Sequence, residues 1–66
     1  MEVTINGKPR NIAENNTLLD LLESLQVSPK TVIIEHNGQI VRRDGFADAR
    51  IQRGDRLELI QIVGGG

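Results

Sequence analysis

The residues with the clearest chemical potential are the glycines that end the chain, Gly64, Gly65 and Gly66. Glycine has no side chain to pack and loses more conformational entropy than other residues when it is ordered, so we expect this tail to contribute nothing to a core. It offers instead a thin strip of backbone that can enter a narrow channel on another protein, and an unhindered carboxylate at Gly66. The glycines follow a strand pattern directly and, taken as the end of the chain, join nothing else. This favours a functional tail over a disordered end or a cloning remnant.

Side-chain chemistry is sparse in the rest of the chain. His36 lies beside an Asn-Gly turn signal, and the sequence offers it neither a partner nor a pocket for general-base catalysis, so we interpret it as a surface turn residue. The aspartates do not have the spacing of a calcium-binding loop. The chain has no Cys and one His, which disfavours a thiolate or histidine-built zinc site. We therefore expect no catalytic residue, no metal and no bound cofactor, and we do not expect an enzyme.

The size and charge of the chain argue against several further classes of function. With 66 residues the chain is one domain, and a domain this small buries only about 60% of its unfolded surface, enough for one sheet and one helix. Eight Lys and Arg against nine Asp and Glu leave no basic footprint for nucleic acid. No apolar run approaches the roughly 20 residues of a membrane span. The N-terminus begins directly with a strand pattern, so we expect no signal peptide and take the cytoplasm as the default location.

The first half of the chain predicts a hairpin followed by a helix. Apolar residues alternate with polar ones from Met1 to Ile5, and the Asn-Gly pair at 6–7 is typical of a tight hairpin turn, with a return strand over about 9–13. An apolar stripe with spacings of three and four then predicts a helix over about 18–26. The stripe consists of Leu18, Leu21, Leu22 and Leu25. Thr17 and Asp20 have the spacing of a capping box, and Pro29 is expected to end the helix.

The second half predicts three more strands. They span about 31–35, 39–42 and 56–63. The Asn37-Gly38 pair predicts a second hairpin between the first two of them. The segment 43–50 shows no clean period, so we expect a loop with at most one helical turn, in which Phe46 closes the core. The predicted order is ββαβββ, an α+β fold in which a mixed sheet packs on one helix.

One face of the last predicted strand is expected to point away from the core. Leu57 and Leu59 should face the helix, so Ile60 and Ile62 should point away from it, on the same outer face as Ile33. Exposed β-branched residues side by side are typical of a partner surface. Strand residues chosen only for β-propensity would give the same pattern, and the two interpretations remain open at this point.

These features together resemble the ThiS family of sulfur carrier proteins in thiamine biosynthesis. The resemblance rests on the ββαβββ order, on Ile51-Gln52-Arg53-Gly54-Asp55-Arg56-Leu57-Glu58-Leu59, and on the terminal Val63-Gly64-Gly65-Gly66, and it covers the whole chain. It implies a ubiquitin-like β-grasp domain over residues 1–63 and a flexible glycine tail over residues 64–66. The core is poorer in aromatic residues than this family leads one to expect.

The resemblance also implies a mechanism. An E1-like adenylating enzyme of the ThiF type would bind the tail in a tunnel and use ATP and magnesium to adenylate the Gly66 carboxylate. Sulfur, ultimately from cysteine through a desulfurase, would replace AMP and leave a thiocarboxylate. A thiazole synthase of the ThiG type would then take that sulfur to build the thiazole ring. The chain would be a protein co-substrate that is recharged in each cycle.

Two alternatives remain open from the sequence. A carrier of another pathway, such as the small subunit of molybdopterin synthase, would use the same chemistry at its terminal glycine with a different acceptor. A non-covalent ubiquitin-like binding module would tolerate removal of Gly65 and Gly66, whereas a carrier would lose its activity and keep its fold. We expect a monomer, because the outer apolar surface is small and is needed for partners.

Overall fold

The computed structural model describes residues 1–62 as one α+β unit. Its elements in chain order are β1 (Glu2–Ile5), β2 (Lys8–Asn11), α1 (Leu18–Leu25), β3 (Val32–His36), β4 (Gln39–Val41), a short 3-10 turn (Arg43–Gly45) and β5 (Arg56–Gln61). This is the predicted ββαβββ order, which is therefore confirmed, and most strand ends differ from the predicted ones by one or two residues. The predicted strand 56–63 extends into residue 63, which lies outside the described residues.

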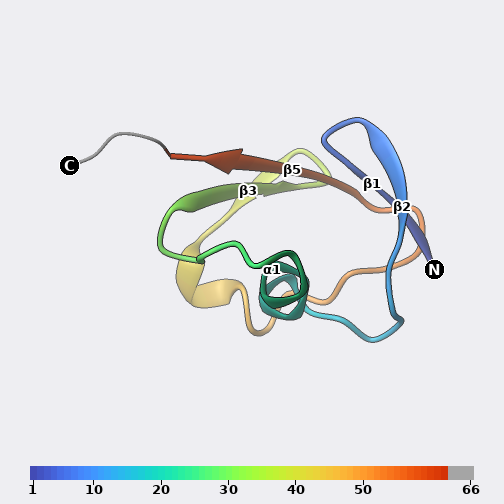
Figure 1. The fold of residues 1–66 in the computed structure, drawn as a ribbon, viewed down its shortest axis with the longest axis horizontal. Coiled ribbons are helices and arrows are strands. Elements are labelled where there is room, and N and C mark those ends of the chain that lie inside the picture. Colours follow the sequence, from blue (N-terminus) through green and yellow to red (C-terminus); the bar gives the residue numbers. More distant parts are fainter. Residues whose placement is uncertain (63–66) are drawn as a thin grey trace.

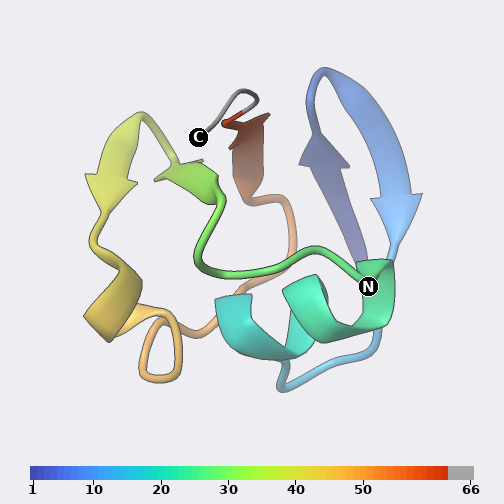
Figure 2. The ribbon, with the colours of Figure 1, turned by 60° about the vertical axis from the view of Figure 1, so that its left-hand side comes forward.

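The five strands form one mixed sheet with α1 across one face (Figures 1 and 2). The strand order is β2-β1-β5-β3-β4, so the last strand of the sequence lies in the middle of the sheet. β1 and β5 are parallel, and every other pair is antiparallel. A parallel pair needs a crossover between its two strands, and here that connection carries the helix to its face of the sheet.

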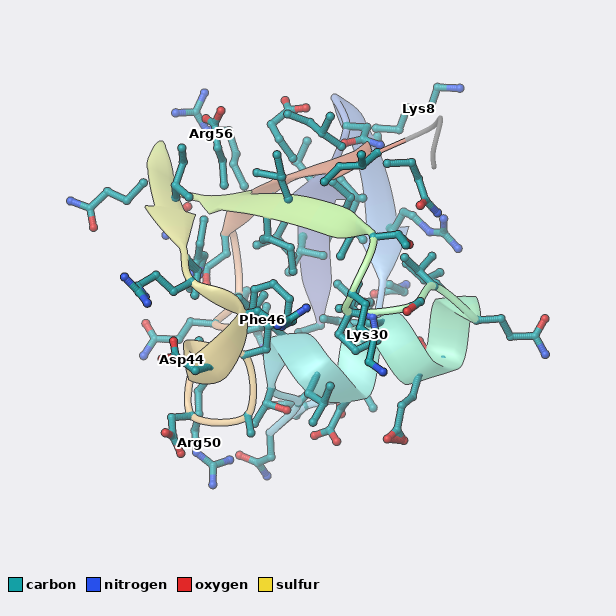
Figure 3. All side chains as sticks on the ribbon, turned by 90° about the vertical axis from the view of Figure 1, so that its left-hand side faces the viewer. Lys8, Lys30, Asp44, Phe46, Arg50 and Arg56 are labelled. Carbon is teal, nitrogen blue, oxygen red and sulfur yellow. The ribbon has the colours of Figure 1, made fainter. Side chains whose placement is uncertain are left out.

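The core lies between the sheet and the helix. It consists of Val3, Ile5, Leu18, Leu21, Leu22, Val32, Ile34, Phe46, Ile51 and Leu57. Phe46, the single aromatic residue, is almost fully buried, and its side chain points from the loop after β4 toward the helix and sheet (Figure 3). The prediction that Phe46 closes the core is confirmed. The other buried core residues are all aliphatic and come from both the sheet and the helix side.

α1 begins as predicted and ends within one residue of the predicted bound, but Pro29 is not what ends it. The Thr17 hydroxyl accepts a hydrogen bond from the Asp20 N–H, and the Asp20 carboxylate accepts one from the Thr17 N–H, both at 3.1 Å, which completes the capping box. The helix ends at Leu25, before Pro29 can act. Gln26 adopts a left-handed conformation with φ of 59°, a common way to terminate a helix, although glycine is the usual residue there.

Both predicted Asn-Gly turns are present. Asn6-Gly7 connects β1 to β2, and Asn37-Gly38 connects β3 to β4, with positive φ at all four residues. Two successive positive φ angles are required by the tight turn that matches the twist of a hairpin, and asparagine and glycine adopt them at the lowest cost. The two hairpins flank β5, one on each side.

Candidate functional site

The predicted tail, Gly64 to Gly66, lies outside the described residues, and so does Val63. The structure does describe the strand that leads to this tail. β5 ends at Gln61, and the next residue, Ile62, donates its N–H to the Thr31 carbonyl oxygen at 2.8 Å. The roles assigned to the tail therefore stay predictions, and the structure bears on them through the surroundings of β5.

The three predicted surface isoleucines are exposed. Ile33, Ile60 and Ile62 expose 38%, 48% and 56% of their areas, while Leu57 on the opposite face of β5 is buried. Ile33 lies directly opposite Ile60 in the β3–β5 pair, so their side chains are on the same face, away from α1. The predicted assignment of faces is confirmed. Whether these residues form a partner surface stays a prediction.

One further residue of this face was not predicted. Ile40 on β4 is the most exposed large apolar side chain among residues 1–62, at 70%, and it lies opposite Glu35, on the outer face. The same alternation that was used for β5 could have found it, because its neighbour Val41 is the half-buried residue of β4. Glu35 in turn lies opposite Glu58, so Ile40 shares a row of the outer face with two glutamates, whereas Ile33 and Ile60 share the next row toward the tail.

The asparagines of the two turns hold β5 from both sides. Asn6 donates its backbone N–H to the Leu57 carbonyl oxygen at 2.9 Å, and its side-chain Oδ1 accepts from the Leu59 N–H at 2.8 Å. Asn37 donates its backbone N–H to the Arg56 carbonyl oxygen at 2.8 Å, and its Oδ1 accepts from the Arg56 N–H at 2.8 Å. In both turns a side-chain oxygen therefore accepts a bond from a backbone N–H of β5.

A polar cluster joins the second hairpin to the turn before β5. The Asp55 carboxylate lies 2.7 Å from His36 Nε2, accepts from the Gln52 N–H at 2.8 Å and accepts from Asn37 Nδ2 at 3.1 Å. Partial burial acts to raise the pKa of Asp55, but these three hydrogen bonds and the charge of His36 outweigh it and hold the pKa below its ordinary value of 3.8. Asp55 therefore stays ionised and ties the two turns together.

The interpretation of His36 as a surface turn residue without a partner is wrong. Its side chain is only 19% exposed and is hydrogen-bonded to Asp55. The two residues are 19 positions apart in the sequence, and the pairing of β3 with β5 brings their turns together. The bond has a structural role, because it closes the junction between two turns.

The described residues offer little further chemistry. Among residues 1–62 no group of three or more His, Asp or Glu side chains is arranged to hold a metal ion. No helix in this part of the chain is long and apolar enough to cross a membrane. The features that stand out are therefore the outer isoleucines and the strand that carries the chain to its glycines.

Comparison with known proteins gives a consistent result. The model of the ThiS family matches residues 3–66. The chain is 32% identical over 66 residues to the sulfur carrier protein ThiS of Escherichia coli, covering both chains fully. It superposes on the crystal structure of the thiamine biosynthesis protein ThiS from Geobacter metallireducens with a TM-score of 0.86 and 35% identity, again covering both chains fully.

A second kind of relative is much longer. The chain is 36% identical over all of its 66 residues to a thiazole synthase of Paramagnetospirillum magneticum. It spans about a fifth of the length of this protein and of the similar thiazole synthase of Magnetococcus marinus. A segment like this chain is thus part of proteins that carry the name thiazole synthase.

Proposed function

The chain belongs to the ThiS family, and from this premise we propose that it is a sulfur carrier protein of thiamine biosynthesis whose Gly66 carboxylate becomes a thiocarboxylate. The observation that carries the proposal is the family match, because it extends from residue 3 through the glycines to residue 66. The thiamine biosynthesis name of the matched Geobacter metallireducens structure favours this pathway over a molybdopterin-type carrier. In this proposal residues 1–63 form the folded domain and residues 64–66 form the reactive tail.

The proposed chemistry is activation of an acyl group followed by substitution. A carboxylate is a poor electrophile, because neither oxygen is a good leaving group. A Gly66 carboxylate oxygen therefore attacks the α-phosphorus of ATP, displaces pyrophosphate and forms an acyl adenylate. The terminal sulfur of a cysteine persulfide, formed by a desulfurase, then attacks the carbonyl carbon, and AMP leaves with the electron pair of the broken bond. A thiol cleaves the resulting acyl disulfide, which leaves a thiocarboxylate at Gly66 and a disulfide on the sulfur donor. ATP and magnesium belong to the activating enzyme, and this chain supplies the carboxylate.

The proposed partners are an E1-like adenylating enzyme of the ThiF type and a thiazole synthase of the ThiG type. The occurrence of a ThiS-like segment within thiazole synthases supports the second partner, because joining two proteins in one polypeptide raises their effective concentration. The exposed Ile33, Ile60 and Ile62 lie on the face of the strand that leads to the tail. We propose that they pack against these partners.

The chain is a co-substrate of other enzymes and provides no catalytic side chain of its own. It acts as a monomer, because its outer face must be free for partners. Its proposed location is the cytoplasm. The tail glycines, Gly64 to Gly66, enter the active-site tunnel of the partner, since a backbone without Cβ atoms has the smallest cross-section.

The test is an intact mass measured after expression beside a ThiF-type activating enzyme and its sulfur source. We expect a mass gain equal to the replacement of one oxygen by sulfur. A chain without Gly66 should show no gain and should melt at the same temperature as the full chain. An unchanged mass of the full chain, with an enzyme that does charge the E. coli carrier under the same conditions, would contradict the proposal.

A further inference from the structure

The last part of β5 has a neighbouring strand on only one side. β1 pairs with β5 at Thr4–Arg56 and Ile5–Leu57 and then turns away into its hairpin. β5 continues to Gln61, paired with β3 along its whole length. Figures 1 and 2 show β5 running on toward the tail while the hairpin of β1 and β2 diverges from it. A strand at the centre of the sheet thus becomes an edge strand near its end.

The hydrogen-bonding groups at this edge can be assigned from the ladder. In an antiparallel pair, alternate residues bond to the neighbouring strand. Ile62 donates its N–H to Thr31, and Ile60 lies opposite Ile33, so the even-numbered residues bond to β3. The backbone groups of Leu59 and Gln61 therefore face the side that β1 has left.

Asn6 covers only the first of these two residues. Its Oδ1 accepts from the Leu59 N–H at 2.8 Å, and its Nδ2 donates to the Leu59 carbonyl oxygen at 3.4 Å. Within the part of the chain that the structure describes, neither β1 nor a side chain bonds to the backbone N–H and carbonyl of Gln61 on this side. Gln61 itself is exposed. One donor and one acceptor therefore point outward, close in sequence to the tail.

The two outer strands of the sheet are protected in ways that β5 is not. On β2, Pro9 lies at a position whose backbone points away from β1, and proline has no N–H to offer. β4 is only three residues long, and Arg42 and Arg43 follow it. Proline, short length and charge are common means of preventing unwanted strand pairing. The edge at Gln61 has none of these features.

We propose that an extended segment of the activating enzyme adds to the sheet at this edge and pairs with the Gln61 backbone. The inference rests on the proposed function, which requires that enzyme to reach the tail. A backbone donor and acceptor on one residue select an extended backbone as their partner, since it presents the complementary groups at the same spacing. The added strand lies where β1 would have continued, next to the residues that lead to Gly66. It fixes the direction in which the tail leaves the sheet.

A proline at position 61 tests this pairing with little damage to the fold. The Gln61 N–H faces away from β3, so Gln61→Pro removes no bond of the existing ladder, and proline is tolerated at strand edges. It does remove the outward donor and puts the ring in the path of an added strand. We expect Gln61→Pro to weaken binding of the ThiF-type enzyme about 10-fold or more, as the loss of one to two hydrogen bonds implies. Gln61→Ala, which keeps the backbone, should bind like the wild type.

Hydrogen exchange provides a second readout on the unmodified chain. In the free protein the amides of Ile60 and Ile62 should exchange slowly, because they bond to β3, whereas the Gln61 amide should exchange rapidly. Addition of the activating enzyme should slow exchange at Gln61 to a rate near those of its neighbours. Slowing that depends only on the concentration of the chain itself would identify a second copy as the occupant and would overturn the assignment to the enzyme.

The outcomes separate this inference from the proposed function. Suppose that the wild type gains sulfur, that Gln61→Pro binds the enzyme as tightly as the wild type does, and that the Gln61 amide still exchanges rapidly in the wild-type complex. The edge pairing is then wrong and the carrier function stands. If Gln61→Pro instead weakens binding only to thiazole synthase, the activating enzyme is the wrong occupant. If the wild type neither binds the enzyme nor gains sulfur, the proposed function fails and this inference fails with it.

Discussion

At its first residues β5 is bonded on both sides, whereas at its last residues it is bonded only to β3. Arg56 is bonded to Asn37 on one side, and Leu57 is bonded to Asn6 on the other. Beyond Leu59 the β1 side is open, and the isoleucines on the outer face are exposed. The strand thus contributes to stability mainly at the end remote from the tail. The end beside the tail adds less to the fold, which leaves its backbone and its side chains available to other proteins.

The largest effect on stability should come from the well-bonded end. Leu57 is 1% exposed and lies at the centre of the sheet, so Leu57→Ala removes buried surface and leaves a cavity. We expect a loss of about 2–5 kcal/mol in the free energy of unfolding, measured by urea denaturation. For a domain this small, that is a large part of the total stability.

The matched control lies three residues further along the same strand. Ile60→Ala removes a side chain of similar size that is 48% exposed. We expect it to cost less than about 1 kcal/mol. If the two substitutions destabilised the protein equally, the contrast between the two ends of β5 would be wrong.

Features encoded within a few residues could be predicted from the sequence. The Asn-Gly pairs specify their turns through backbone conformation alone, and Thr17 caps α1 through an atom three residues away. The alternation along β5 assigned Ile60 to the outer face, because side chains on a strand alternate irrespective of its neighbours. The end of α1 was less predictable, since Gln26 adopts its left-handed conformation with no glycine or proline at that position.

Features that depend on which strands become neighbours could not be predicted in this way. The bond between His36 and Asp55 requires the β3–β5 pair, and the bond between Asn6 and Leu59 joins residues 53 positions apart. The open edge at Gln61 depends on where β1 leaves the sheet relative to β5. Local patterns contain no such information. The tail could be singled out from its glycines, and the resemblance to a known family supplied the chemistry proposed for it, which no periodicity could have assigned.

A smaller effect, on binding, should come from the end of β5 beside the tail. Ile60→Glu puts a charge among the exposed isoleucines, where an apolar partner surface would have to desolvate it. We expect binding to the activating enzyme to weaken about 10-fold or more. The midpoint of thermal unfolding should change little, because the side chain has no role in the core. Titration calorimetry against the enzyme measures the first quantity, and a melting curve measures the second.

The control for this change is Ile40→Glu, on the same face but on β4, in the row of the two opposed glutamates and farther from the tail. If the partner contacts the region next to the tail, Ile40→Glu should weaken binding less than Ile60→Glu. A large drop in the melting midpoint of Ile60→Glu would mean that the exposed face contributes to the fold after all.

The smallest effect is on the pH dependence of stability, and it comes from Asp55 at the well-bonded end of β5. Its folded-state pKa lies below 3.8, so its carboxylate stabilises the fold above the pKa of an unfolded aspartate, and this contribution is lost as the pH falls through the folded-state pKa. In Asp55→Asn this part of the acid sensitivity should be absent. Unfolding free energies of the two proteins, measured from about pH 6 to about pH 3, should differ most at the upper end and converge at the lower end.

Asp55→Asn keeps the size of the side chain, so the comparison isolates the charge and the hydrogen bonds that depend on it. Asp48→Asn, at an exposed position, gives the matched control for the loss of one carboxylate. The junction of the two turns should loosen in Asp55→Asn at neutral pH, which hydrogen exchange of the Gln52 amide can detect, because that amide bonds to the carboxylate. The free energy of unfolding is plotted against pH for the wild type and for Asp55→Asn. If the two curves stayed parallel over the whole pH range, the ionisation of Asp55 would add nothing to the stability of the fold. The well-bonded end of β5 would then depend on its backbone ladder and its two asparagines alone.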